Sequence, residues 1–224
     1  MTVTLGEEIA LLALDDDSGA AKDRHAAGWA VAGGILLELT LAGRVVADDA
    51  RLTVVDPAPT GDALLDGRLT ALTDWAAQDK KAKVGDWLTK DQAKAFDAAV
   101  ESLCARGVLT ERKHRTLGIF VSRRYPEADG SVEREVRHRL ADVVLYGAEP
   151  DERTTGLIAL LHAADLHRAA FPDVARKQVE PRMEAVAEGQ WAAEDLRAAV
   201  QDMQAVLAAV TVATTVAATV VTTS

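Results

Sequence analysis

Apolar side chains recur every three or four positions through much of the first half of the chain, which is the spacing of one face of an α-helix. This pattern predicts helices around residues 9–14, 29–41 and 64–72. The segment Thr60-Gly61-Asp62 directly precedes the third of these, and its residue types are those of a turn and an N-cap that open a helix. The first half is therefore expected to be rich in helix.

The second half continues the helical pattern. Ser131 has the residue type of an N-cap for a helix that reaches Tyr146. After a break at Pro150 the chain is expected to form a helix that reaches about His167. Two more helices are expected, one over residues 174–186 and one from about residue 192. The fold class predicted for the whole chain is mainly α.

Two short β-hairpins are expected, each directly after a helix. The first comprises residues 45–55, with a turn at Asp48-Asp49, and the second follows Leu109 with charged residues 111–115 and apolar residues 117–121. Gly43 and Gly107 occupy equivalent places before the hairpins, where a glycine provides the left-handed turn that ends a helix. We therefore predict a single helical-bundle domain over residues 1–224, with small β-hairpins following two of the helices.

The last 22 residues, 203–224, carry no charge and are long enough to span a bilayer. Six of them are Thr, and the apolar residues Val206, Val210, Ala213, Ala217 and Val220 form one stripe of a helix. This stripe favours a helix buried in the bundle, and a tail anchor in a membrane is the alternative.

Composition describes a folded protein of a reducing compartment. The 224 residues are 49% hydrophobic and 27% charged, which is typical of a globular domain. Cys104 is the only cysteine and excludes both an intrachain disulfide and a multi-thiolate zinc site. Glu7 and Glu8 interrupt the stretch that would form the apolar part of a signal peptide, so we expect a cytoplasmic location. Abundant Ala, Val, Asp and Arg indicate a high-GC bacterial source.

Charge is unevenly distributed. The formal net charge is −10, which argues against a general nucleic-acid binder. Residues 112–139, which we call the basic segment, contain eight Lys or Arg and four acids, a net +4 that leaves −14 for the rest of the chain. Such a segment is suited to contact with an anionic surface. The alternative is that these cations pair only with neighbouring carboxylates.

One face of the expected helix in this segment carries candidate phosphate ligands. Arg134 and Arg137 are three positions apart and therefore share a helix face, with His138 four positions after Arg134. Two guanidinium groups on one face can bind a phosphate through paired hydrogen bonds.

Five segments together resemble the Golgi phosphoprotein 3-like family, peripheral membrane proteins whose eukaryotic members bind phosphatidylinositol 4-phosphate. The segments are residues 5–12 (LGEEIALL), 34–39 (GILLEL) with Gly43-Arg44, 58–66 (APTGDALLD), 107–110 (GVLT) and 162–165 (HAAD). The resemblance implies a non-enzymatic adaptor without a cofactor that lies on a membrane. Its partners would be anionic phospholipid headgroups and basic peptide tails of membrane proteins, and its oligomeric state is left open.

The resemblance also implies which side chains contact lipid. It assigns this role to basic residues at the start of the helix from Ser131 and to an Arg and a Trp near the early Gly-containing helix. The candidates in this chain are Arg134, Arg137, His138, Arg139, Trp29 and Arg24. Two positions depart from the family pattern, because Ala32 stands where the early Arg is expected and Asp23 near where the Trp is expected. A one-residue ambiguity on the later helix leaves Glu135 and His138 as alternative occupants of the two basic positions.

No constellation in the sequence predicts an enzyme. His162, Asp165 and His167 have metal-ligand residue types, but on a continuous helix His167 lies about 140° further round than His162, so we expect structural roles and no metal. Nucleophile-elbow, P-loop and dinucleotide-binding motifs are absent from the sequence.

A different class of function is the alternative to lipid binding. Two helix-plus-hairpin units resemble winged helices, which bind DNA or act in transcription. The charge of −10 and the lack of a basic recognition helix before either hairpin argue against that role.

Overall fold

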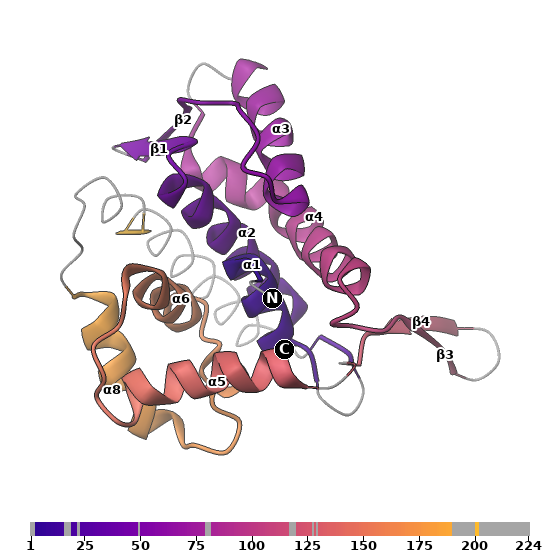
Figure 1. The fold of residues 1–224 in the computed structure, drawn as a ribbon, viewed down its shortest axis with the longest axis vertical. Coiled ribbons are helices and arrows are strands. Elements are labelled where there is room, and N and C mark those ends of the chain that lie inside the picture. Colours follow the sequence, from indigo (N-terminus) through magenta and orange to yellow (C-terminus); the bar gives the residue numbers. More distant parts are fainter. Residues whose placement is uncertain are drawn as a thin grey trace, which may run out of the picture.

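The computed structural model describes residues 3–15, 19–21, 23–48, 50–78, 82–116, 120–126, 128, 130–189 and 200–201. These residues form a mainly α structure, as the sequence predicts, with two separate two-stranded antiparallel sheets (Figure 1). The elements are α1 (Leu5–Ala13), α2 (Arg24–Leu41), β1 (Val45–Asp48), β2 (Arg51–Val54), α3 (Ala63–Gln78), α4 (Val84–Ala105), β3 (Arg112–Thr116), β4 (Phe120–Arg124), α5 (Ser131–Val144), α6 (Glu152–Ala163), α7 (His167–Ala170) and α8 (Arg176–Ala187).

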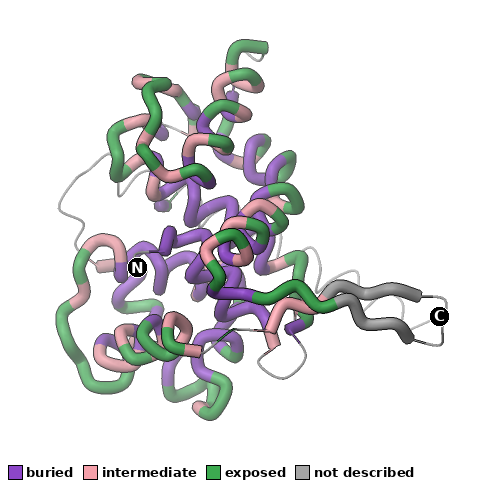
Figure 2. Tube along the Cα trace, turned by 45° about the vertical axis from the view of Figure 1, so that its right-hand side comes forward, coloured by how far each residue is buried: buried purple, intermediate pink, exposed green. Residues whose placement is uncertain are grey.

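Helix α1 occupies the centre of the bundle, and each of its nine residues is buried. Thr4 and Glu7 form a capping box, in which each side chain binds the other's backbone N–H and so satisfies two amides at the start of the helix. Glycines allow α1 to approach α2 closely, because a Cβ on Gly6 would lie 2.6 Å from a side-chain carbon of Ile35. Buried positions form a continuous region through the middle of the bundle (Figure 2).

The two predicted hairpins are present, and each follows a helix that ends at a glycine. Gly43 follows α2 and Gly107 follows α4, with φ of 67° and 74°, the left-handed conformation that ends a helix. β1 pairs with β2 from Val45↔Val54 to Asp48↔Arg51. The β3–β4 hairpin extends away from the helices in Figure 1, whereas β1 and β2 lie beside α2 and α3.

Two predicted helix boundaries are wrong. Ser131 is the first residue of α5, because Gly130 adopts φ of 69° and takes the N-cap position without a side-chain hydrogen bond. The helix predicted to reach His167 ends at Ala163, where Asp165 turns the chain with φ of 57° and a separate short helix, α7, begins. The helix expected near Val174–Val186 is confirmed as α8.

Of the helix expected from about residue 192, residues 200 and 201 are described; both are helical and Val200 is buried. The uncharged run 203–224 lies outside the described residues. Among the helices that are described, none is both long enough and apolar enough to cross a bilayer.

Candidate functional site

The turn at Thr60-Gly61-Asp62 organises the start of α3. Asp62 accepts hydrogen bonds from the backbone N–H groups of Leu64 and Leu65, which confirms its predicted role as a helix cap. Asp66 then accepts from the backbone and hydroxyl of Thr60, at 2.6 and 2.7 Å, and so closes the turn. These hydrogen bonds outweigh the opposing effect of burial and lower the pKa of Asp66. The motif therefore serves the fold.

Arg106 connects three of the five segments that carry the family resemblance. It lies directly before Gly107 and forms an ion pair with Asp62 of the turn before α3. Its Nε atom lies 3.3 Å from Glu7 of α1, whose side chain is fully buried. Segments that are far apart in the sequence therefore meet at one guanidinium group.

Glu8 forms a second charged junction inside the bundle. Arg139 of α5 and Arg153 of α6 both bind its carboxylate, with Arg153 Nη1 2.7 Å from Oε1. Arg153 also donates to the carbonyl oxygen of Val3 and pairs with Glu38 of α2. Desolvation is the main reason that the pKa of Glu38 is raised, and Arg153 only partly offsets it.

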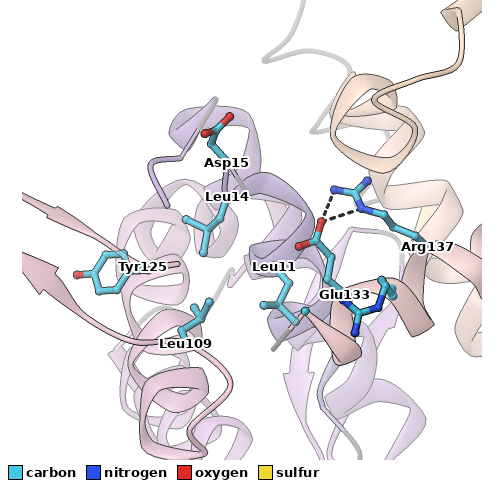
Figure 3. Close-up of a pocket in the computed structure, with 9 residues that line it drawn as sticks. Leu11, Leu14, Asp15, Leu109, Tyr125, Glu133 and Arg137 are labelled. Atoms are coloured by element: carbon cyan, nitrogen blue, oxygen red, sulfur yellow. Dashed lines mark hydrogen bonds and ion pairs between the residues drawn. The ribbon is translucent and has the colours of Figure 1, made fainter. Parts of the chain in front are cut away.

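A cavity of about 360 Å³ lies at the root of the β3–β4 hairpin, where α1 ends and α5 begins (Figure 3). One wall is apolar and comprises Leu11, Leu14, Leu109 and the ring of Tyr125. The other is polar and comes from the first turns of α5, and its residues are Gly130, Glu133, Arg134 and Arg137, with Asp15 at the end of α1.

The predicted pair Arg134 and Arg137 shares this cavity, but Arg137 is held within the protein. Its Nε donates to Glu133 at 2.7 Å, and its Nη1 donates to the carbonyl oxygens of Ala169 and Ala170 at 2.7 and 2.9 Å. Arg137 therefore satisfies carbonyls at the end of α7. Arg134 is exposed on the cavity wall. The structure assigns a structural contact to one member of the expected phosphate-binding pair.

The other lipid candidates lie at separate places. His138 is exposed and its Nδ1 lies 3.0 Å from Asp142, while Arg139 binds the buried Glu8. Arg24 pairs with Asp97 of α4 and lies over the ring of Phe96, with 5.0 Å from its guanidinium carbon to the ring centroid.

Trp29 lies in the core with 5% of its surface exposed. Neither Trp29 nor Arg24 lines the cavity at the hairpin root. The six predicted residues therefore do not converge on that cavity.

His162, Asp165 and His167 come together more closely than a continuous helix would allow. Because α6 ends at Ala163 and Asp165 reverses the chain, His162 Nδ1 lies 3.1 Å from His167 Nε2, and His167 Nδ1 lies 3.0 Å from Asp165 Oδ1. The expectation that His167 points away from His162 is wrong, since it assumed an unbroken helix. In the described part of the chain, no group of three or more His, Cys, Asp or Glu side chains is placed to hold a metal.

Comparison with known families confirms the resemblance found in the sequence. The sequence model of the Golgi phosphoprotein 3 (GPP34) family matches residues 5–203, most of the chain. The chain belongs to this family. All five segments that suggested the Golgi phosphoprotein 3 family fall inside the match. The ion pairs of Glu7 and Glu8 in the first segment, and of Asp62 in the third, explain why charged residues stand within these two segments.

Sequence reasoning named Glu7, Glu8 and Asp62 but predicted no ion pair for them, and it named Arg139 only as a lipid candidate. Arg106 and Arg153 were not singled out, although each binds two carboxylates from other elements. One signal was available, because two adjacent glutamates in an apolar helix of a Golgi phosphoprotein 3 family chain require cationic partners if they are buried. The sequence does not reveal which arginines these are.

Proposed function

We propose that this chain is a non-enzymatic peripheral membrane protein that binds anionic phospholipids through the basic segment, residues 112–139. The cations expected to contact lipid are those of the β3–β4 hairpin together with Arg134. The observation that carries the proposal is the pairing of like charges across a projecting hairpin: Arg112 is in register with Arg124, and Lys113 with Arg123.

Like charges directly opposite each other destabilise an isolated pair of strands. An anionic surface would offset this repulsion, and each basic residue close to anionic lipid contributes about 1 kcal/mol. The hairpin contains five Lys or Arg in its ten strand residues and no acid. Phe120 and Val121 are the first two residues of β4, in register with Thr116 and Arg115, at the end of the hairpin opposite the Arg112–Arg124 pair. Apolar residues beyond a cationic base favour a membrane surface over a nucleic acid.

The start of α5 supports the same interpretation. The N-terminus of a helix carries partial positive charge, and the N-cap before α5 is Gly130, which has no side chain to cap the helix. Arg134 is exposed nearby on the wall of the cavity at the hairpin root. Arg137 and Arg139 contribute less, because Glu133 and Glu8 already neutralise them. Family membership is consistent with this role. We further propose that the protein is cytoplasmic in a bacterium and acts as an adaptor, in which the acidic part of the chain outside the basic segment holds basic peptide tails of membrane proteins.

Vesicle co-sedimentation tests the proposal. We expect the protein to bind vesicles containing phosphatidylglycerol or cardiolipin, to bind phosphatidylcholine vesicles weakly, and to lose binding as salt is added. The double variant R112E/R124E should weaken binding by at least about thirty-fold, the equivalent of losing two basic contacts. Arg134→Glu should have a smaller effect in the same direction.

The matched control is K90E/K177E, which makes the same change in net charge at exposed positions of α4 and α8. It should leave vesicle binding nearly unchanged. Equal losses in the two double variants would show that overall charge and not the hairpin governs binding. Tighter binding to duplex DNA than to the vesicles would favour the DNA-binding alternative.

A further inference from the structure

A chain of hydrogen bonds and ion pairs connects α6, α7 and α8. It runs from His162 through His167 and Asp165 to Arg176, the first residue of α8, and from there to Glu180. His167 is 2% exposed, and the two imidazole rings meet edge to face with their centroids 5.2 Å apart. One carboxylate oxygen, Oδ1 of Asp165, connects the histidine pair to the start of α8. It lies 3.0 Å from His167 Nδ1 and 2.6 Å from Arg176 Nη1.

This arrangement fixes where the imidazole protons reside. The carboxylate of Asp165 accepts, so Nδ1 of His167 carries its proton, and Nε2 of a neutral His167 is left to accept a proton from His162 Nδ1. One further proton can enter at Nε2 of His162 without breaking either contact. A second cannot, because both nitrogens that face each other at 3.1 Å would then carry a proton.

Among the described residues, Asp165, Arg176 and Glu180 act directly on the pair. Arg168 and Asp23 line a cavity that Asp165 shares. From α5, Arg137 binds carbonyls at the other end of α7 and is paired with Glu133. The acids of α1 and α2 form ion pairs elsewhere. Glu7 pairs with Arg106, and Glu8 and Glu38 pair with Arg153.

We propose that the His162–His167 pair is a proton-sensitive latch that holds α8 against α6 and α7 near neutral pH and releases it in mild acid. The second proton would place two imidazolium groups and the guanidinium of Arg176 around the single carboxylate of Asp165. Glu180 offsets this only in part, because it already pairs with Arg176. Separation of Arg176, and with it the start of α8, relieves the repulsion.

The direction of the pH response follows from the titration of His167. Burial lowers the pKa of His167, and Arg176 adds to the effect. A histidine whose pKa in the closed form is lower than its ordinary value of about 6.5 stabilises the closed form fully above pH 6.5. This stabilisation is lost as the pH falls from about 6.5 toward the lowered pKa. If the open form binds one more proton than the closed form, the opening equilibrium constant rises about tenfold for each pH unit below about 6.5.

Hydrogen exchange of the full chain between pH 7.5 and 5 tests the latch, after correction for the intrinsic dependence of exchange on pH. In the unmodified protein we expect amides of α8 to lose protection about tenfold per pH unit below about 6.5, while amides of α4 keep theirs. His162→Gln should flatten this response, since a glutamine carbonyl can accept a proton from a doubly protonated His167. His167→Gln, the more deeply buried change, should do the same if the protein folds.

His138→Gln is the control, because His138 is 79% exposed on α5 and contacts Asp142 on the surface. It should leave the response of α8 unchanged. The latch is refuted if the protection of α8 does not depend on pH, if α4 loses protection in parallel, or if His162→Gln responds as the unmodified protein does. The last result would mean that burial of His167 alone sets the response.

Discussion

Arg153 stabilises the structure by binding two carboxylates from different helices at once. Glu8 of α1 has a side chain that is only 3% exposed, and Glu38 of α2 is also largely covered. Without Arg153, Glu8 would keep Arg139 alone, and Glu38 would lose the cation that is described beside it. Both carboxylates would keep the cost of desolvation with less compensating attraction. The contribution of Arg153 is therefore much larger than that of an arginine on the surface.

We expect Arg153→Leu to lower the free energy of unfolding by about 3–5 kcal/mol, measured by urea denaturation at pH 7. Arg24→Gln is the matched control, since Arg24 and Asp97 are both more than half exposed, and it should cost about 1 kcal/mol or less. Similar costs for the two variants would show that Arg139 alone compensates Glu8 and that Glu38 reaches solvent.

Asp151 is the N-cap of α6. Its side chain accepts a hydrogen bond from the N–H of Thr154, at 2.7 Å, and hydrogen bonding to Thr154 is the main reason that its pKa is lowered. A carboxyl group with a lowered pKa adds stability above its ordinary value of about 3.9, and that stability is lost as the pH falls through the lowered pKa.

Asp151→Ala should therefore cost about 1 kcal/mol at pH 7, and the difference from the unmodified protein should shrink as the pH falls below about 4. Thermal unfolding across this pH range measures it. Asp173→Ala, at an exposed position in the turn before α8, should cost little at any pH. A cost of Asp151→Ala that stays constant with pH would assign the effect to something other than the ionised cap.

At the scale of elements, the same arrangement of helix, left-handed glycine and hairpin is used twice. A Cβ at Gly43 or Gly107 would meet no atom within 4 Å, so the need for glycine at both positions comes from the backbone conformation alone. A left-handed conformation costs a residue with a Cβ about 1–2 kcal/mol. The two glycines are therefore required for the direction in which each hairpin leaves its helix.

Gly43→Ala and Gly107→Ala should each destabilise the protein by about 1–2 kcal/mol in urea denaturation. The control is Gly67→Ala within α3, where a Cβ also meets nothing within 4 Å but the backbone is helical, so this change should stabilise by about 0.5–1 kcal/mol. The same sign of effect at all three positions would contradict the explanation from backbone conformation.

For the whole molecule, two residues differ from those that the resemblance implies for a lipid contact. Ala32, which stands where the family pattern places an arginine, is 1% exposed inside α2, and Asp23 caps the start of that helix. Residue 32 therefore provides no charged donor of the kind that contributes about 1.5–3 kcal/mol to a phosphate contact.

We predict that vesicles with phosphatidylinositol 4-phosphate will be bound little better than vesicles of equal charge made with phosphatidylglycerol or cardiolipin. Ala32→Arg should not create a preference, because the new side chain would start from a buried position and no tryptophan stands at residue 23. Co-sedimentation at matched surface charge measures this. A strong preference in the unmodified protein would place Arg24 and Trp29 at the lipid after all.

The sequence by itself determined the local features of this protein. Helical periodicity gave the mainly α class, the glycines at 43 and 107 marked where two helices end and hairpins begin, and Asp62 was identified as a cap. These features depend on residues close together in the chain, whose spacing and backbone preferences are visible without any tertiary contact.

Only the tertiary structure decided which charged groups meet. Arg106 and Arg153 reach carboxylates more than forty residues away, Arg137 binds carbonyls of α7, and His162 meets His167 because Asp165 turns the chain. In the sequence these side chains look like ordinary surface cations or unrelated histidines. Their partners depend on how the helices pack, and burial then makes each pairing energetically decisive, since a charge removed from water must be matched by another group brought to it by the fold.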